Sequence, residues 1–264
     1  MRGRAKRLSI PRRWVIDIMR FAVEVPAVPV QRPMNLGAVI AARNVNLNRL
    51  PWSGIFAKAY AITARDFPAL RQVYLARPWP HLYEYPHSIA TIAVERTYAG
   101  EPMVFGYAIE DPASLPLNEI GRRIRHAEEA PIEDIESFRH LVQLAHLPVF
   151  LRRPIWWLLF NVAQLRGELL GTFGVSVVTA MGGDIIQMLP IWTTFLSYGL
   201  IRSDGSLDVR ITIDHRVLDG ATAARALVRL EEALNGPILR ELQKRQDVNS
   251  DHASSPEPLI KARA

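Results

Sequence analysis

The chain has 264 residues, is 49% hydrophobic and contains no cysteine. This length and apolar content allow one large core or two small ones, and the lack of cysteine excludes disulfides, thiolate metal sites and a cysteine nucleophile. The formal net charge of +6 arises from residues 1–13, which hold six basic residues and no acidic one, whereas the rest of the chain is balanced.

The basic N-terminus is predicted to be an arm, residues 1–9, attached to a neutral body. Such an arm could contact anionic lipid, nucleic acid or a phosphate-bearing ligand, or it could be a solvated chain end. Nucleic-acid binding is not expected, because the body has no excess of basic residues. Asp17, Arg20 and Glu24 interrupt any secretory apolar segment. We therefore expect a cytoplasmic protein, with membrane association through the basic N-terminus as an alternative.

The N-terminal half is predicted to contain helices and strands in alternation. In chain order these are a helix over 14–22, an extended segment over 28–36, a helix over 54–66, strands over 89–94 and 103–109, and helices over 119–129 and 132–147. Pro68 supports the end of the second helix, because proline disfavours helix at the preceding residue. Ala99 and Gly100 form the predicted turn between the two strands.

An apolar run over 154–163 contains Trp156 and Trp157 and follows Arg152 and Arg153. It is too short to span a bilayer. It could lie in a membrane interface, pack on a neighbouring subunit or form the wall of a substrate channel.

The C-terminal half is predicted to hold more strands. Alternating residues indicate a strand over 172–181, and a hairpin over 191–202 and 207–214 that is joined at Asp204-Gly205. A helix is expected over 221–234. The polar composition from about residue 243 onward indicates a disordered end.

The predicted strand over 207–214 alternates with period two. Its apolar row is Leu207, Val209, Ile211 and Ile213, and its polar row is Asp208, Arg210, Thr212 and Asp214. This pattern predicts one buried face and one exposed face. His215 has the parity of the apolar row, so that row is predicted to end in a side chain that titrates near neutral pH. A proton-transfer group at the rim of a core suits a general base.

The same residues also have purely structural interpretations that involve no catalysis. His215 could be a hydrogen-bonded core residue, and Asp219, which precedes Gly220 and an Ala/Leu-rich run, could be a helix N-cap. In the strand over 172–181, Thr179 shares the apolar face and Ser176 lies on the other face. Threonine is common in strands without any catalytic role.

The stretch Asp214-His215-Arg216-Val217-Leu218-Asp219-Gly220-Ala221 resembles the active-site signature of the catalytic domain of dihydrolipoyl acyltransferases, the core subunits of 2-oxoacid dehydrogenase complexes. It is also similar to the His-x-x-x-Asp-Gly motif of chloramphenicol acetyltransferase. Further segments resemble the family in the same order, at residues 11–16, 67–70, 92–94, 117–120 and 171–182. The resemblance therefore extends over residues 10–236.

This resemblance implies an α/β fold of the chloramphenicol acetyltransferase-like class, a two-layer sandwich with a mixed β-sheet flanked by helices. It implies three parts of the chain. These are a basic N-terminal arm at 1–9, an acyltransferase-like catalytic domain at 10–236, and a polar, partly disordered C-terminal tail at 237–264.

The resemblance also implies a reaction, acyl transfer from a thioester to a thiol or hydroxyl acceptor. His215 would be the general base. Thr179 would donate a hydrogen bond to the oxyanion of the tetrahedral intermediate, and Ser176 is the candidate in the alternative register. No covalent enzyme intermediate is needed, which suits a chain without cysteine.

Three further residues are expected to support this site. Asp219 would hold the local backbone instead of transferring protons. Arg12 aligns with an arginine that can pair with the motif aspartate in the family, so it is the candidate partner of Asp219. Gly220 would permit a tight turn from strand to helix.

Members of the family form trimers in which the histidine and the Ser/Thr come from different chains. The resemblance thus implies a homotrimer or a higher trimer-based assembly, with coenzyme A as part of an acyl-CoA substrate, or an acyl carrier in its place. No metal is expected, and no lipoyl attachment is expected in this chain. The alternatives are a non-catalytic oligomeric scaffold or partner-binding member of the same fold, and an enzyme that acylates a lipid-like acceptor at a membrane surface.

Overall fold

The computed structural model describes residues 3–45, 49–177, 182–188 and 191–244. Its centre is a six-stranded mixed sheet with the strand order β1-β8-β7-β6-β4-β5. These strands are β1 (Ala27–Asn35), β4 (Ile89–Tyr98), β5 (Glu101–Glu110), β6 (Phe173–Val175), β7 (Thr194–Tyr198) and β8 (Ser206–Asp214). Strand β6 runs parallel to β4 and β7, and the other neighbouring pairs are antiparallel. The predicted α/β class, a mixed sheet flanked by helices, is confirmed.

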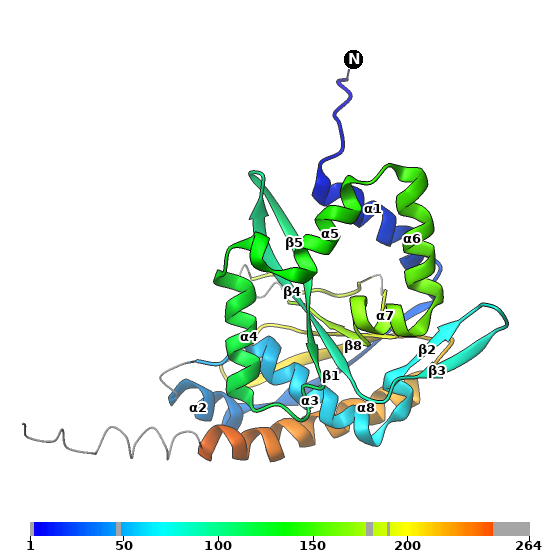
Figure 1. The fold of residues 1–264 in the computed structure, drawn as a ribbon. Helices are drawn as coiled ribbons and strands as arrows, with labels where there is room; N and C mark the ends of the chain where they lie inside the picture. Colours follow the sequence, from blue (N-terminus) through cyan, green and yellow to red (C-terminus); the bar gives the residue numbers. More distant parts are fainter. Residues whose placement is uncertain (1–2, 46–48, 178–181, 189–190, 245–264) are drawn as a thin grey trace, which may run out of the picture.

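The α-helices of the described chain surround this sheet (Figure 1). They are α1 (Ile10–Ala22), α2 (Gly37–Val45), α3 (Trp52–Asp66), α4 (Leu117–Glu129), α5 (Glu136–His146), α6 (Val149–Asn161), α7 (Ala163–Leu170) and α8 (Gly220–Ala233). A two-stranded hairpin, β2 (Gln72–Leu75) with β3 (His81–Glu84), projects from one side of the molecule.

The main core lies between one face of the sheet and the helices α3, α4 and α8. Alternate residues of β4, namely Ala90, Ile92 and Val94, belong to this core. Gly54 of α3 lies against α4, where an added Cβ would come within 2.9 Å of the Ile120 side chain. The glycine therefore lets the two helices approach closely, as tight packing of the core requires.

A second group of helices, α1, α5, α6 and α7, lies over the opposite face of the sheet (Figure 1). Its members form a separate apolar cluster that contains Ile18, Trp156, Phe160 and Leu170. Arg152 of α6 forms a buried ion pair with Asp17 of α1, which joins two helices that are distant in sequence. Arg152 is thus buried within the protein and is not available to a membrane interface.

Two predicted segments differ in detail from the structure. The helix predicted over 132–147 is divided into a 3₁₀ turn at Ile132–Asp134 and helix α5, because Ile135 between them is extended. The apolar run over 154–163 lies in α6 and the start of α7. Among the helices of the described chain, none combines the length and the apolar composition that crossing a membrane requires.

The prediction that β8 has one buried and one exposed face is wrong. Arg210, Thr212 and Asp214 of the polar row are buried together with the apolar row. Polar groups cover this second face: the Arg210 guanidinium donates to the Gln31 side chain at 3.0 Å and lies 3.5 Å from the Asp184 carboxylate. Partnered polar residues can be buried in this way at modest cost, which a two-fold hydropathy pattern does not reveal.

The folded body also continues beyond the predicted domain end at residue 236. Helix α8 passes through a π-helical turn at Leu234–Ile238 into further helix that reaches residue 244. Ile238 and Leu242 are buried in the main core. Residues 237–244 therefore belong to the domain, and the rest of the predicted tail lies outside the described residues.

The turn before β8 agrees with the predicted Asp204-Gly205 signal. Gly205 has a φ of 78°, and the Ser206 N–H donates to the Asp204 carboxylate at 2.9 Å. The turn also contacts the start of α2, because the Leu36 N–H donates to the Gly205 carbonyl at 3.0 Å. A Cβ at Gly205 would lie 2.9 Å from the Gly37 Cα.

We expect Gly205→Ala to lower the free energy of unfolding by about 2–3 kcal/mol, because positive φ and a backbone contact both oppose a Cβ. Gly100→Ala is the matched control, since Gly100 has a φ of 79° in another hairpin turn but an added Cβ there would meet no atom within 4 Å. Its loss should be about 1 kcal/mol. Urea unfolding followed by circular dichroism measures both, and equal losses would show that the contact with Gly37 is unimportant.

Candidate functional site

Strand β8 ends in a buried carboxylate that organises the turn after it. Asp214 is 2% exposed, and it accepts hydrogen bonds from the Arg216 backbone N–H at 3.0 Å and from the Arg216 guanidinium at 2.9 and 2.7 Å. The guanidinium also lies 4.6 Å from the centre of the Tyr74 ring. A buried carboxylate is stable only with such charge-assisted partners, so this ion pair holds the turn in one shape.

His215 lies in this turn with its side chain at the surface. Its backbone N–H donates to the Pro26 carbonyl at 3.0 Å, and its Nδ1 is 3.2 Å from the Leu218 carbonyl oxygen. Because a carbonyl can only accept, the neutral ring carries its proton on Nδ1 and keeps a lone pair on Nε2. The prediction that His215 continues the buried row is wrong: β8 ends at Asp214, and His215 is exposed.

Asp219 begins helix α8 as its N-cap, which confirms the helix-cap interpretation. Its Oδ1 accepts a hydrogen bond from the Thr222 N–H at 2.7 Å. The hydrogen bond from the Thr222 backbone lowers the pKa of Asp219, so its carboxylate is ionised at neutral pH. Gly220 was expected to adopt a backbone conformation that only glycine tolerates. Its φ is not left-handed, however, and an added Cβ would meet no atom within 4 Å.

The expected pair between Arg12 and Asp219 does not form in the described part of the chain. Arg12 lies in the first turn of α1, and its guanidinium is 3.8 Å from the Glu101 carboxylate of β5. The side chain of Arg12 is 67% exposed. Asp219 is instead satisfied locally by Thr222, which leaves no need for a distant cation.

Arg166 of α7 is a buried residue beneath the motif that the sequence pattern does not indicate. Burial lowers its pKa to about 10, while the nearby Tyr85 and Asp214 favour its charged form. Its guanidinium donates to the Ile191 carbonyl at 2.8 Å and lies 5.3 Å from the centre of the Phe160 ring. Arg166 therefore remains charged at neutral pH and adds positive potential near Asp214. The sequence feature that could have indicated Arg166 is the position of a charged residue within a largely apolar segment.

Thr179 and Ser176 are the two candidate hydroxyl donors. Thr179 lies outside the described residues. Ser176 follows β6 directly, and its N–H donates to the Leu196 carbonyl at 3.2 Å. Phe173 and Val175 belong to the main core, so the opposite parity of Ser176 directs it to the other face, where it lines a cavity.

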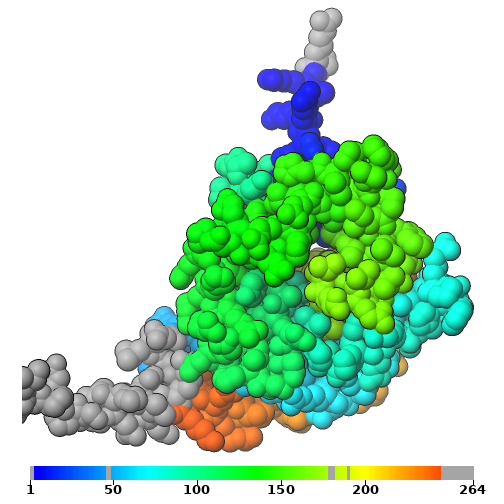
Figure 2. All heavy atoms as spheres, in the orientation of Figure 1, coloured from blue at the N-terminus to red at the C-terminus, as the bar shows by residue number. Residues whose placement is uncertain are grey.

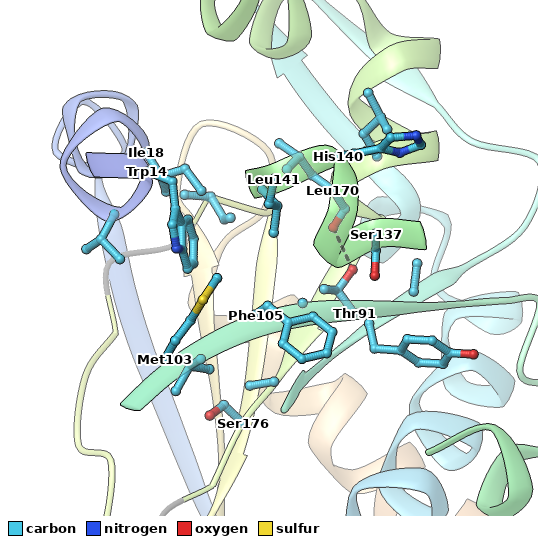
Figure 3. Close-up of a pocket in the computed structure, with 18 of the residues that line it drawn as sticks. Trp14, Ile18, Thr91, Met103, Phe105, Ser137, His140, Leu141, Leu170 and Ser176 are labelled. Atoms are coloured by element: carbon cyan, nitrogen blue, oxygen red, sulfur yellow. Dashed lines mark hydrogen bonds between the residues drawn. The ribbon is translucent and has the colours of Figure 1, made fainter. Parts of the chain in front are cut away.

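This cavity, of about 1200 Å³, lies between the second face of the sheet and the helices α1, α5, α6 and α7. The surface is hollowed between α5, α6 and α7 (Figure 2). Much of the lining is apolar, and Figure 3 shows Trp14, Ile18, Met103, Phe105, Leu141 and Leu170 around it. The Thr91 hydroxyl, on the cavity face of β4, donates to the Leu170 carbonyl at 2.6 Å. Trp156 also lines the cavity, in keeping with the channel-wall interpretation of the tryptophan segment.

The motif and the cavity are separate features of the chain. Neither His215 nor Asp219 is among the residues that line the cavity, whereas Ser176 is. Within residues 3–45, 49–177, 182–188 and 191–244, no group of three or more His, Asp or Glu side chains is arranged to hold a metal ion. The single chain thus presents the His215 imidazole on its surface and a lined cavity elsewhere.

No protein-family model and no curated protein matches this chain, but solved structures do. A dihydrolipoamide acetyltransferase from Azotobacter vinelandii has a TM-score of 0.63 at 18% identity, over 90% of this chain and 95% of that one. A probable dihydrolipoamide acetyltransferase from Listeria monocytogenes has a TM-score of 0.61 at 17% identity, over 88% and 94%. The cubic core of a pyruvate dehydrogenase multienzyme complex has a TM-score of 0.55 at 18% identity, over 90% and 95%. The predicted chloramphenicol acetyltransferase-like fold is thus confirmed.

We expect Asp214→Asn to lower the free energy of unfolding by about 2–3 kcal/mol, because it leaves the Arg216 guanidinium without its buried counter-charge. Asp208→Asn is the matched control on the same strand. Its partner Arg202 is 49% exposed, and a surface pair of this kind contributes less than about 1 kcal/mol. Chemical denaturation of the two variants gives the comparison, and similar losses would argue against a special role for the Asp214 ion pair.

Proposed function

We propose that this chain is an acyltransferase that moves an acyl group from a thioester to a thiol or hydroxyl acceptor, with His215 as the general base. The observation that carries the proposal is the hydrogen bond between His215 Nδ1 and the Leu218 carbonyl. It leaves the Nε2 lone pair on an exposed ring, where an acceptor can reach it. The fold shared with acetyltransferase catalytic chains supports the same reaction class.

In the proposed reaction, His215 Nε2 takes the proton of the acceptor as its sulfur or oxygen attacks the thioester carbonyl carbon. The carbonyl electrons move to oxygen and form a tetrahedral intermediate. When this intermediate collapses, the carbon–sulfur bond breaks, and the leaving thiolate takes the proton from the imidazolium. The histidine is then neutral again, so no metal, redox partner or covalent enzyme intermediate is needed.

A hydroxyl from the segment after β6 is the proposed donor to the intermediate's oxyanion. Ser176 and Thr179 are the two candidates, and the placement of Ser176 on the cavity face favours Ser176. Such a donor acts because it is already oriented when negative charge develops on the carbonyl oxygen.

Asp219 is proposed to act through structure. It caps α8 and so fixes the turn that carries His215. The Azotobacter vinelandii enzyme was studied for the role of a serine, a histidine and an asparagine in its catalytic mechanism, and that asparagine follows the histidine by four residues. Asp219 follows His215 at the same spacing, and asparagine and aspartate accept the same capping hydrogen bond.

We infer that the working unit is an oligomer, most simply a homotrimer. Among the described residues, the base and the lined cavity are not brought together within one chain. A second protomer could place His215 beside the cavity of its neighbour. One structurally similar chain belongs to a cubic core, and each corner of a cube lies on a threefold axis.

The proposed acyl donor is acyl-CoA, or an acyl carrier, in the cytoplasm. Arg225 is exposed near the motif, and a guanidinium group suits the phosphates of coenzyme A. Residues 3–8 of the basic arm are exposed and have no regular structure, so the arm is also free to contact an anionic surface.

The alternative function is a non-catalytic scaffold of the same fold. Helix α6 favours it, because Phe150, Trp157 and Leu158 are 71%, 47% and 45% exposed and could pack on a partner. The acyltransferase and scaffold proposals differ in whether His215 matters for any chemical turnover.

His215→Ala is expected to reduce turnover by a factor of roughly 10²–10⁴, the usual contribution of a general base. Thiol release from acetyl-, butyryl- and decanoyl-CoA, followed with a thiol-reactive chromophore, measures it.

The control for this experiment is His87→Ala, which removes another surface imidazole, 3.0 Å from the Glu110 carboxylate and outside the motif. It should leave turnover unchanged. Equal turnover of His215→Ala and wild type would sink the catalytic proposal, and a wild type inactive on every thioester tested would favour the scaffold.

Ser176→Ala and Thr179→Val separate the two hydroxyl candidates. The variant that removes the oxyanion donor should have a turnover about 10²–10³-fold lower than the wild type, with little change in KM, because the hydrogen bond strengthens only in the transition state. The other variant should retain wild-type turnover. Steady-state kinetics with the best acyl-CoA provides the measurement, and no loss in either variant would remove this hydroxyl from the mechanism.

A further inference from the structure

The outer side of helix α6 is an exposed surface rich in apolar side chains. The helix buries its other side against the rest of the protein, through Arg152, Trp156, Leu159 and Phe160. The exposed side carries Phe150, Arg153, Trp157 and Leu158. Residues three and four positions apart lie on the same side of a helix, so these four side chains form one strip.

The loop between β2 and β3 extends this strip. The Arg77 guanidinium lies 6.0 Å from the centre of the Trp157 ring, which places the loop beside α6. Trp79 follows in the same loop and is 68% exposed. Figure 1 shows α6 and the hairpin on the same side of the molecule. We call the set of Arg77, Trp79, Phe150, Arg153, Trp157 and Leu158 the α6 surface.

The charge of the α6 surface is positive. The two stretches of chain that build it, residues 67–83 and 137–167, contain no aspartate and no glutamate. The carboxylate that α1 directs toward α6, that of Asp17, is buried and paired with Arg152. Arg77 and Arg153 are therefore not neutralised by acidic residues of these two stretches.

The basic N-terminal arm adds positive charge at the same end of the molecule. The arm leads directly into α1, which packs on α6 with the Phe21 and Phe160 rings stacked 4.3 Å apart. Arg4, Lys6 and Arg7 of the arm are exposed. The arm leaves the fold where α1, α5 and α6 lie together (Figure 1), so it can reach a charged surface that α6 contacts.

The combination of aromatic, aliphatic and arginine side chains matches the boundary of a lipid bilayer. Tryptophan rings are favoured at the level of the lipid headgroups, and guanidinium groups pair with phosphates. A second copy of this chain fits less well, because a symmetric contact would place the arginines of the two copies side by side. An anionic bilayer covers the apolar side chains and neutralises the arginines together.

We propose that the α6 surface docks on an anionic lipid bilayer. Phe150, Trp157 and Leu158 enter the headgroup region, and Arg77 and Arg153 contact the lipid phosphates. Helix α6 lies along the membrane surface, because its other side is buried in the protein. This inference goes beyond acyl transfer, since it uses neither His215 nor any residue that lines the cavity.

Flotation of the full chain with extruded vesicles tests the proposal. Vesicles of phosphatidylcholine alone are compared with vesicles that contain about one third phosphatidylglycerol. We expect at least about tenfold stronger binding to the anionic vesicles at low ionic strength, and weaker binding as salt screens the charges. Absence of binding, or equal binding to the two kinds of vesicle, would overturn the proposal.

Variants locate the contact on the α6 surface. Phe150→Glu and Trp157→Glu should each weaken binding to anionic vesicles at least about tenfold, because each removes an apolar contact and adds a repelled charge. Arg77→Gln and Arg153→Gln should each weaken it about fivefold, the contribution of one basic residue near an anionic surface.

The matched controls lie in α8 and in the helical segment after it. Val228→Glu and Arg240→Gln make the same kinds of change at exposed positions of this other part of the protein, and both should bind as the wild type does. Circular dichroism of each variant checks its folding. Should Trp157→Glu fail to fold, Phe150→Glu still decides the matter. Equal losses in the controls and in the α6 variants would refute the assignment to α6.

Two further measurements separate this surface from other uses of it. In a chain without residues 1–8, Phe150→Glu should still weaken vesicle binding, and no further loss would assign lipid binding to the arm alone. Light scattering should give the same assembly for Phe150→Glu and the wild type. A smaller assembly for Phe150→Glu would make the α6 surface a contact between copies and overturn the proposal. His215→Ala should bind vesicles as the wild type does, so a failure of the catalytic proposal is distinguishable from a failure of this one.

Discussion

The ion pair between Asp214 and Arg216 is the constraint on which the geometry of the motif depends. A carboxylate that is 2% exposed must find charged partners, and its nearest partner is two residues away in sequence. The chain therefore turns sharply at the end of β8, and this turn exposes His215 and delivers Asp219 to the start of α8. Arg166, buried beneath the motif, strengthens the arrangement through its positive charge.

The two faces of the sheet also differ in what they pack against. One face packs against α3, α4 and α8 in the main core. The other face meets α1, α5, α6 and α7 around a large cavity, with the buried pair of Arg152 and Asp17 joining α6 to α1. The hydroxyl of Ser176 lies on the cavity side, while the imidazole of His215 lies outside it. A single chain separates these groups, and the proposed homotrimer would bring them together.

Much of this arrangement was predictable where the determining interactions are local. The glycine turn at Asp204-Gly205, the helix cap at Asp219 and the helix end before Pro68 each depend on residues a few positions apart. The predictions were wrong where distant segments decide. The polar row of β8 is buried because Gln31 and Asp184 cover Arg210, and residues 237–244 belong to the domain because Ile238 and Leu242 complete the main core.

The sequence by itself determined the reaction class to consider and the α/β fold class to expect, both through the resemblance that the His-x-x-x-Asp-Gly motif carries, and it determined individual helices and strands through their periodicity. Only the tertiary structure decided the direction of the His215 ring, the partner of Arg12 and the existence of the cavity. The physical reason is that hydrogen bonds and periodicity within an element are encoded by nearby residues. A cavity, in contrast, is the space left between helices and a sheet whose packing involves the whole chain.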